Sequence, residues 1–225
     1  MLPRALLLSA VVIWGWTFVA TKVLVAEIGP LEIFALRLAI GLPFLGAVVL
    51  LKRVPLRFAR ADALPLVILL VSDGNPARLG SLHSTGDWLV IASAHTWAIY
   101  TVVTRDLVGR RDPLAVTFGI LLIAATLTAI LFIASGDATR VQSLSPRGVA
   151  ALLYLAIPGL ALGQWFWQEG VSRLGVTRAG VYLFLEPLAT LALAIPLLGE
   201  RFGAVTAVGG GLVLAGVYLG QRKGT

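Results

Sequence analysis

The stretch VVIWGWTFVATKVLVAEIGPL, residues 11–31, recurs without gaps as AHTWAIYTVVTRDLVGRRDPL, residues 94–114. The offset is 83 residues, the separation of Trp14 from Trp97. Leucine and valine matches are common by chance between apolar helices, so the evidence for a repeat comes from the other residue types. These pair Trp14 with Trp97, Thr21 with Thr104, Lys22 with Arg105 and Pro30 with Pro113. The chain therefore contains an internal repeat.

The composition is that of a membrane protein. Of the 225 residues, 58% are hydrophobic and 13% are charged, with a mean hydropathy of +0.93, whereas soluble domains are about 25% charged. A helix needs about 20 apolar residues to cross a bilayer core of about 30 Å. Several stretches reach that length with few charges, so we expect an all-α polytopic protein that resides in the lipid bilayer.

The apolar stretches place the expected helices and their directions. Three of them separate the starts of the two repeat copies, and an odd number makes the copies inverted, as in many secondary transporters. Residues 63–71 are short and cover only about 14 Å at 1.5 Å per residue. The polar stretch 72–87 is expected to be a linker loop. The expected spans are residues 5–26, 31–51, 63–71, 88–108, 114–134, 149–168, 176–198 and 204–219.

The net charge of +7 is spread along the chain. Lys and Arg lie between apolar stretches and form no single basic stripe, so we expect no nucleic acid partner. If every expected span crosses and the N-terminus is cytoplasmic, 12 basic residues lie inside and 5 outside. If residues 63–71 do not cross, the division is 9 against 8. The positive-inside rule thus favours a crossing with both termini in the cytoplasm, although the length of residues 63–71 argues against it.

Motifs for several kinds of chemistry are missing from the sequence. It has no cysteine and two histidines, which excludes disulfides, iron–sulfur clusters and thiolate metal sites. It has no Walker loop, EF-hand, HExxH motif or nucleophile elbow. We therefore expect no cofactor, no metal and no enzymatic activity.

At the repeated residues the sequence resembles the EamA-type transporters of the drug/metabolite transporter superfamily. VVIWGWTFVATK is similar to their first-helix motif, PLEIFALRLAIGLP to their second helix, and WAIYTVVTR to the opening helix of their second repeat. GVTRAGVYLFLEPLATLALAIPLLGERF followed by VGGGLVLAGVYL resembles their last two helices and is the most specific match. The resemblance implies ten helices in two five-helix inverted repeats. It also implies export of small metabolites, amino acids or drug-like solutes across the inner membrane by alternating access.

The chain departs from that pattern in its first repeat, which is shortened as if by an internal deletion. A complete second repeat is expected over residues 88–225, whereas residues 1–71 hold two helices and part of a third before the linker. About seven or eight helices would remain in place of ten. Transport is then one hypothesis, and a transport-inactive truncated membrane protein or an interaction subunit is another. A homodimer, in which a second copy supplies the missing wall, and an intramembrane enzyme using Glu186 are weaker alternatives.

Two pairs of side chains are candidates for the wall of a substrate cavity. Trp14 and Thr17 in the first copy, and Trp97 and Tyr100 in the second, are each three residues apart and share one helix face. Aromatic rings and hydroxyls suit a small amphipathic solute. The alternative is that these side chains form interfacial belts or pack helices together.

Two charged residues are candidates for ion or proton coupling. Glu186 is expected about 15 Å into its span and Arg37 about 10 Å from the opposite boundary, which places them about 5 Å apart in depth. An acid inside the membrane is a functional-site hypothesis by default. The alternatives are a carboxyl that stabilises the backbone beside Pro187 and an arginine that extends to the outer headgroups.

A further candidate wall lies in the sixth expected span. Gln164 and Gln168 share one face of a helix, and Trp165 lies beside them. We expect Gln164 and Trp165 to contact the solute if that face lines the cavity. The glycines Gly210 and Gly211 are expected to let helices approach closely.

Overall fold

The computed structural model describes residues 2–56, 101, 104–135, 143–198, 203, 210, 211 and 214. Within these residues the regular structure is helical, and no strand occurs there. Residues 104–110 form a helical segment. The other helices are α1 (Leu2–Val25), α2 (Pro30–Leu51), α5 (Pro113–Ser135), α6 (Pro146–Tyr154), the π-helix η3 (Leu155–Leu162), α7 (Gly163–Leu174), α8 (Val176–Leu183) and α9 (Glu186–Leu198).

Several expected features fall outside the described residues. They include the short span 63–71, the linker 72–87 and most of the spans 88–108 and 204–219. Five other stretches are long and apolar enough to cross a membrane, which confirms a polytopic helical protein. They are Leu2–Val25, Pro30–Leu51, Pro113–Ala134, Pro146–Leu174 and Val176–Leu197.

The helices α2 and α5 begin at equivalent positions of the two repeat copies. Pro30 and Pro113, which match at the offset of 83 residues, are the first residues of these helices. Proline suits this position because its missing N–H is not needed in the first helical turn. Gly29 precedes α2 in extended conformation, with ψ at 162°. Before α5, the Asp112 carboxylate accepts a hydrogen bond from the Leu114 N–H at 2.8 Å.

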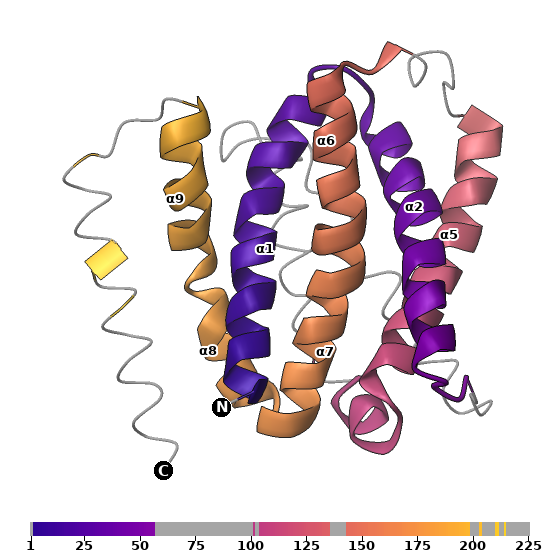
Figure 1. Ribbon diagram of the computed structural model, residues 1–225, viewed down its shortest axis with the longest axis vertical. Helices are drawn as coiled ribbons and strands as arrows, with labels where there is room; N and C mark the ends of the chain where they lie inside the picture. Colours follow the sequence, from indigo (N-terminus) through magenta and orange to yellow (C-terminus); the bar gives the residue numbers. More distant parts are fainter. Residues whose placement is uncertain are drawn as a thin grey trace, which may run out of the picture.

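The two copies run in opposite directions, as the sequence predicts. Figure 1 shows α2 descending from the end of the bundle where it is joined to α1, while α5 ascends from the other end. The two helices pack against each other. Gly46 of α2 brings the backbone close to the Phe118 ring of α5, to which a Cβ at Gly46 would lie at 3.2 Å. This antiparallel pair makes the inverted relation visible within the described residues.

A helix of the second repeat lies between two helices of the first. The segments α6, η3 and α7 form one continuous helix of 29 residues, Pro146–Leu174, which we call the central helix. It contacts α1 on one side and α2 on the other, as Figure 1 shows. The helix extends beyond the expected 149–168 at both ends. It begins where the Ser145 hydroxyl accepts a hydrogen bond from Gly148 N–H at 3.0 Å, and it ends at Gly175, whose φ is +79°.

Small residues allow the central helix to lie this close to its neighbours. A Cβ on Gly41 of α2 would be 2.6 Å from the Ala156 carbonyl oxygen, and a Cβ on Gly159 would be 2.8 Å from the Thr17 methyl group of α1. In lipid, helices associate by such packing because apolar surface alone does not drive them together. The buried side chains Leu7, Leu45 and Leu155 are each fully covered.

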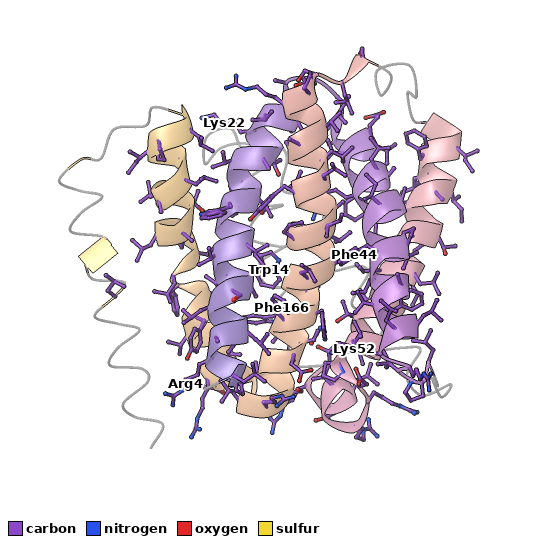
Figure 2. All side chains as sticks on the ribbon, viewed as in Figure 1. Arg4, Trp14, Lys22, Phe44, Lys52 and Phe166 are labelled. Carbon is purple, nitrogen blue, oxygen red and sulfur yellow. The ribbon has the colours of Figure 1, made fainter. Side chains whose placement is uncertain are left out.

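Basic residues gather at one end of the bundle. Figure 2 shows Arg4 and Lys52 at the lower end and Lys22 at the upper end. We call the lower end the basic end and the upper end, where the turn 26–29 joins α1 to α2, the turn end. The basic end also holds the helix termini that carry Arg53, Arg105, Arg110, Arg111, Arg173 and Arg178, whereas Arg147 belongs to the turn end. These residues divide between the two ends as the expected topology requires.

Candidate functional site

The middle of α1 contacts the central helix through the predicted Trp14 and Thr17. The Trp14 indole Nε1 donates a hydrogen bond to the Gly159 carbonyl at 3.0 Å, and the Thr17 hydroxyl donates to the Trp14 carbonyl at 2.6 Å. A Cβ on Gly163 would lie 2.5 Å from the Trp14 Nε1. Thr17 and Trp14 therefore occupy a notch formed by two glycines four residues apart, Gly159 and Gly163. Figure 2 shows Trp14 near mid-height of the bundle.

The notch coincides with an irregular part of the central helix. Pro158 has no N–H, so the α-helical bond to the Tyr154 carbonyl cannot form, and the wider turns of η3 accommodate the proline. The Tyr154 hydroxyl donates a hydrogen bond to the Ile13 carbonyl of α1 at 3.0 Å. The Tyr154 side chain of the central helix thus contacts the α1 backbone beside Trp14, and the Trp14 side chain contacts the backbone of η3. Such π-helical turns occur frequently at functional sites.

A second interrupted helix reaches α1 at the same level. Residues 184 and 185 separate α8 from α9, and Pro187 follows Glu186 at the start of α9. The interruption fits the sequence because Pro187 has no N–H to donate to the Leu183 carbonyl, and proline is well tolerated in the first turn of a helix such as α9. The sequence predicts a span over 176–198 with Glu186 in its interior, and the apolar stretch Val176–Leu197 confirms that span. Within that span the structure places Glu186 in the first turn of α9.

The contact between α1 and α9 is close enough to involve their backbones. A Cβ on Gly15 would lie 2.7 Å from the Ala189 Cβ and 2.9 Å from the Glu186 carbonyl oxygen. The Thr190 hydroxyl donates to the Gly15 carbonyl at 3.0 Å and lies equally close to the Glu186 carbonyl. We call this assembly the node: residues 13–17 of α1 with Tyr154, Gly159, Gly163, Glu186, Ala189 and Thr190 around them.

The tryptophans of α7 divide between two sides of the central helix. Trp167 is 1% exposed and its ring centroid lies 5.5 Å from that of Trp14. Trp165 instead packs with α2 and α5 residues, and the Lys52 ammonium lies 5.0 Å from its ring centroid. Gln168 is 1% exposed, and the buried Gln164 Oε1 has no hydrogen-bond partner within the described residues. Gln164 follows the notch glycine Gly163 directly.

The remaining predicted site residues are placed as follows. Arg37 lies on α2, on the far side of the central helix from α9 and Glu186 (Figure 1). Trp97 and Tyr100 lie outside the described residues. In the part of the chain that the structure describes, no three acidic or histidine side chains are grouped to hold a metal ion.

Sequence reasoning missed several members of the node. Gly15, Tyr154 and Thr190 were not among the predicted residues. The glycines Gly159 and Gly163 carried a readable signal, because glycines four residues apart in an apolar segment often mark a close helix contact. The sequence held no comparable signal for Thr190, whose role depends on which helix lies beside α9.

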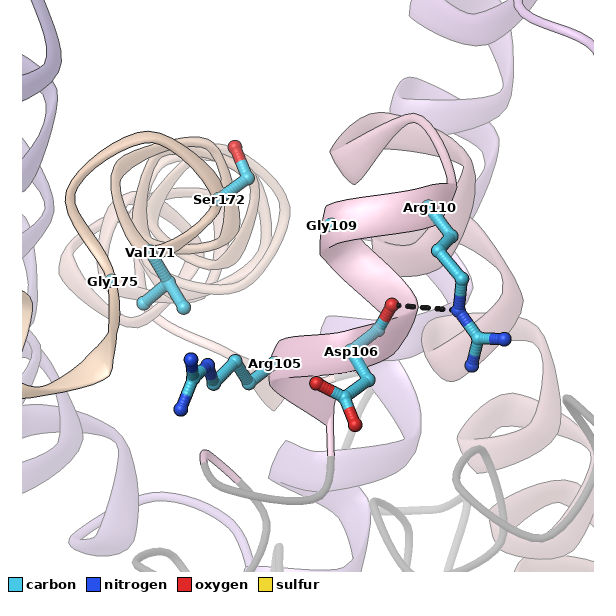
Figure 3. A pocket seen from close by; sticks show the side chains of 7 residues that line it. All are labelled: Arg105, Asp106, Gly109, Arg110, Val171, Ser172 and Gly175. Carbon is cyan, nitrogen blue, oxygen red and sulfur yellow. Dashed lines mark hydrogen bonds between the residues drawn. The ribbon is translucent and has the colours of Figure 1, made fainter.

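A pocket of about 580 Å³ lies away from the node, at the basic end. Figure 3 shows it between the helical segment 104–110 and the end of α7, with Arg105 directed toward Val171 and Gly175. The Arg110 Nε donates to the Asp106 carbonyl at 3.1 Å. The basic end is therefore hollowed, in a region lined by residues of both charges.

Known proteins resemble the chain over most of its length. The sequence profile of the EamA-like transporter family matches residues 2–73 and 84–220. An uncharacterized transporter of Archaeoglobus fulgidus is 32% identical over 157 residues, which are 70% of this chain and 54% of that protein. A "probable terminal-alkyne amino-acid exporter" of Streptantibioticus cattleyicolor is 30% identical over 63% of this chain and 47% of its own length. A "probable amino-acid metabolite efflux pump" of Salmonella typhimurium is 26% identical over 78% of this chain and 61% of its own length.

The matches define a family and a fold. The chain spans about half the length of the Archaeoglobus and Streptantibioticus relatives that it matches. A solved crystal structure superposes on it with a TM-score of 0.74 at 18% identity, covering 99% of each chain, and this likeness shows the fold alone. The family profile, the inverted repeat and the apolar helices agree. The chain belongs to the EamA-like transporter family, and thus to a family of membrane transporters rather than enzymes.

Proposed function

We propose that this protein is a secondary transporter that exports small metabolites, amino acids or drug-like solutes across the inner membrane by alternating access. The single observation that carries the proposal is the convergence of two irregular helices on the middle of α1. The π-helix η3 meets α1 at Trp14, and the break before α9 meets it at Gly15. Interrupted helices near the membrane midplane, between inverted repeats, are where secondary transporters bind their solutes.

The node offers the solute several kinds of contact. Trp14 supplies an aromatic face and Thr17 a hydroxyl, and Gln164, which adjoins the node at Gly163, adds an amide oxygen without a partner among the described residues. Glu186 suits a substrate amine, a cation or a proton. We keep Trp165, Trp97 and Tyr100 as proposed substrate contacts from the sequence, and Arg37 as a second coupling candidate.

Relatives and charge support the solute class and the orientation. Two relatives carry names that describe export of amino acids or their metabolites. The positive-inside rule assigns the basic end to the cytoplasm. The proposed direction of transport is therefore from the basic end to the turn end.

The shortness of the chain favours a second candidate function. The matched region is about half of the Archaeoglobus and Streptantibioticus relatives. A protein without transport activity, or one that acts as a membrane subunit or homodimer, follows if the absent helices are needed to enclose the solute path. This candidate function predicts that no solute stabilises the purified protein and that the protein carries no solute across a bilayer.

Counterflow in proteoliposomes tests the proposal. We would load liposomes with unlabelled amino acids or cationic drugs and follow uptake of the labelled solute. Uptake above that of protein-free liposomes is expected for the wild type, with a loss of about ten-fold or more in Glu186→Gln if that carboxylate binds the solute amine. The matched control is Glu169→Gln, because the Glu169 carboxylate pairs with Arg173 on its own helix. Uptake equal to protein-free liposomes for every solute would contradict the proposal.

A further inference from the structure

A carboxylate joins the two repeats at the turn end. Glu27, in the turn between α1 and α2, accepts two hydrogen bonds from Ser145, which precedes the central helix. The Ser145 backbone N–H lies 2.8 Å from Oε2, and its hydroxyl lies 2.6 Å from Oε1. The same hydroxyl accepts a hydrogen bond from Gly148 N–H at 3.0 Å and so caps the central helix. We call this contact the Glu27 clasp.

The surroundings of the clasp favour a charged carboxylate. Glu27 lies at the N-terminus of a 29-residue helix, where unpaired N–H groups and the helix dipole attract an anion. A Cβ on Gly148 would lie 2.8 Å from the Glu27 Cδ, so the missing side chain makes room for the carboxylate. The hydrogen bonds from the Ser145 side chain and backbone hold the pKa of Glu27 below its ordinary value of 4.5.

Charges on each neighbouring element accompany the clasp. Lys22 is in the last turn of α1, Glu32 in the first turn of α2 and Arg147 in the first turn of α6. Glu32 is 7% exposed and folds back over Gly29 of its own turn. Two hydrogen bonds from Ser145 join Glu27 to the start of the central helix.

Different features mark the two ends of the bundle in the described residues. The turn end is tied across the repeats by the Glu27 clasp, whereas the basic end contains the pocket of about 580 Å³. Alternating access rocks one repeat against the other around a fixed site. In such a motion the turn 26–29, which belongs to the first repeat, must move relative to the start of the central helix, which belongs to the second.

We propose that Glu27 is a gating residue of the transport cycle, and that its clasp on Ser145 holds the turn end closed while the basic end is open. The proposal rests on the proposed transport function. Glu27 acts as a positioning residue that does not touch the solute. When the clasp breaks, the turn end opens and the node becomes accessible from that side.

The absence of cysteine from the chain makes the gate directly measurable. Thr17→Cys places a single thiol at the node, and a membrane-impermeant thiol reagent is added from one face at a time in vesicles of known orientation. Glu27→Gln removes the charge and one of the two acceptor oxygens that Ser145 uses, because the amide NH₂ group cannot accept a hydrogen bond. We expect labelling from the turn end to rise about ten-fold, the factor expected for losing a charge-assisted hydrogen bond, and labelling from the basic end to fall.

Matched variants separate a gate from a purely structural contact. Glu169→Gln removes a carboxylate whose partner among the described residues, Arg173, lies on its own helix, and it should leave both labelling rates unchanged. Ser145→Ala should reproduce the effect of Glu27→Gln, while Ser145→Thr, which retains the hydroxyl, should restore the wild-type rates. If Glu27→Gln does not fold, the two Ser145 variants carry the same test because they leave Glu27 in place.

The outcomes distinguish the gate from the transport function. Labelling that rises from both faces, or from neither, in Glu27→Gln and Ser145→Ala would overturn the gate. Unchanged labelling together with intact counterflow would overturn the gate alone. A third outcome is that counterflow fails in every variant while labelling still rises from the turn end and falls from the basic end. That result would count against transport and leave the clasp as a gate of a protein that moves no tested solute.

Discussion

Gly15→Ala tests the close contact of α1 with α9. The new Cβ would lie 2.7 Å from the Ala189 Cβ, and ordinary van der Waals contact begins at 3.4 Å. The helices would therefore have to separate by about 0.7 Å, because the Ala189 Cβ and the Glu186 carbonyl oxygen are fixed to the α9 backbone and cannot rotate away. The hydrogen bond from Thr190 to the Gly15 carbonyl, now 3.0 Å, would lengthen to about 3.7 Å and be lost.

The expected cost follows from these two changes. Overpacking a well-packed contact costs about 1–3 kcal/mol, and an interhelical hydrogen bond in a membrane protein contributes about 0.6–1.7 kcal/mol. Alanine recovers about 1 kcal/mol because it favours helix more than glycine does. The free energy of unfolding should fall by about 1–4 kcal/mol in Gly15→Ala.

Unfolding in mixed detergent micelles measures this change. The control is Gly180→Ala in α8, where a Cβ would meet no atom within 4 Å. That variant should be as stable as the wild type or up to about 1 kcal/mol more stable. If Gly15→Ala were also neutral or stabilising, α1 and α9 would not be in backbone contact, and the node as described would be refuted.

Three further predictions address the notch, the end of the central helix and the clasp. Trp14→Phe keeps an aromatic ring but leaves the Gly159 carbonyl without its donor, so the free energy of unfolding should fall by about 0.6–1.7 kcal/mol; no change would show that this bond contributes nothing. Gly175→Ala places a side chain at φ +79° and ψ 161° and should cost about 1–3 kcal/mol in the same unfolding assay, whereas an unchanged stability would contradict that backbone conformation. The stability that the Glu27 clasp contributes should be constant above the ordinary carboxyl pKa of 4.5. It should be lost as the pH falls through the lowered pKa of Glu27, because protonation weakens the clasp. Acid titration of thermal unfolding should therefore show a smaller loss in Glu27→Gln than in the wild type; an equal loss in both would exclude the clasp as its source.

The sequence predicted the helix bounds well where a repeat and a proline marked them. Pro30 and Pro113 match in register and begin α2 and α5, and the apolar length of each span fixed its other end to within a few residues. The inverted direction of the copies followed from the number of intervening spans. These features depend on local composition, which is why a single sequence could reveal them.

The arrangement of the helices was harder to predict. All the spans are apolar around most of their surface, so hydropathy does not indicate which helices are neighbours. Trp165 therefore could not be assigned to the α2 side of the central helix, nor Trp167 to the α1 side. Pro187 did signal a backbone irregularity beside Glu186, but only the structure shows that α9 begins there and meets Gly15.

The central claim is that a transported solute binds at the node, and solute protection of Thr17→Cys tests it most directly. The variant would be labelled with a thiol reagent from the basic end, with and without the solute that gives the strongest counterflow. We predict that saturating solute slows labelling at this position, while labelling of a cysteine at the exposed Leu2 is unchanged. Equal labelling of Thr17→Cys with and without a solute that the protein moves would contradict the account, because the solute would then cross without contacting α1 at the node.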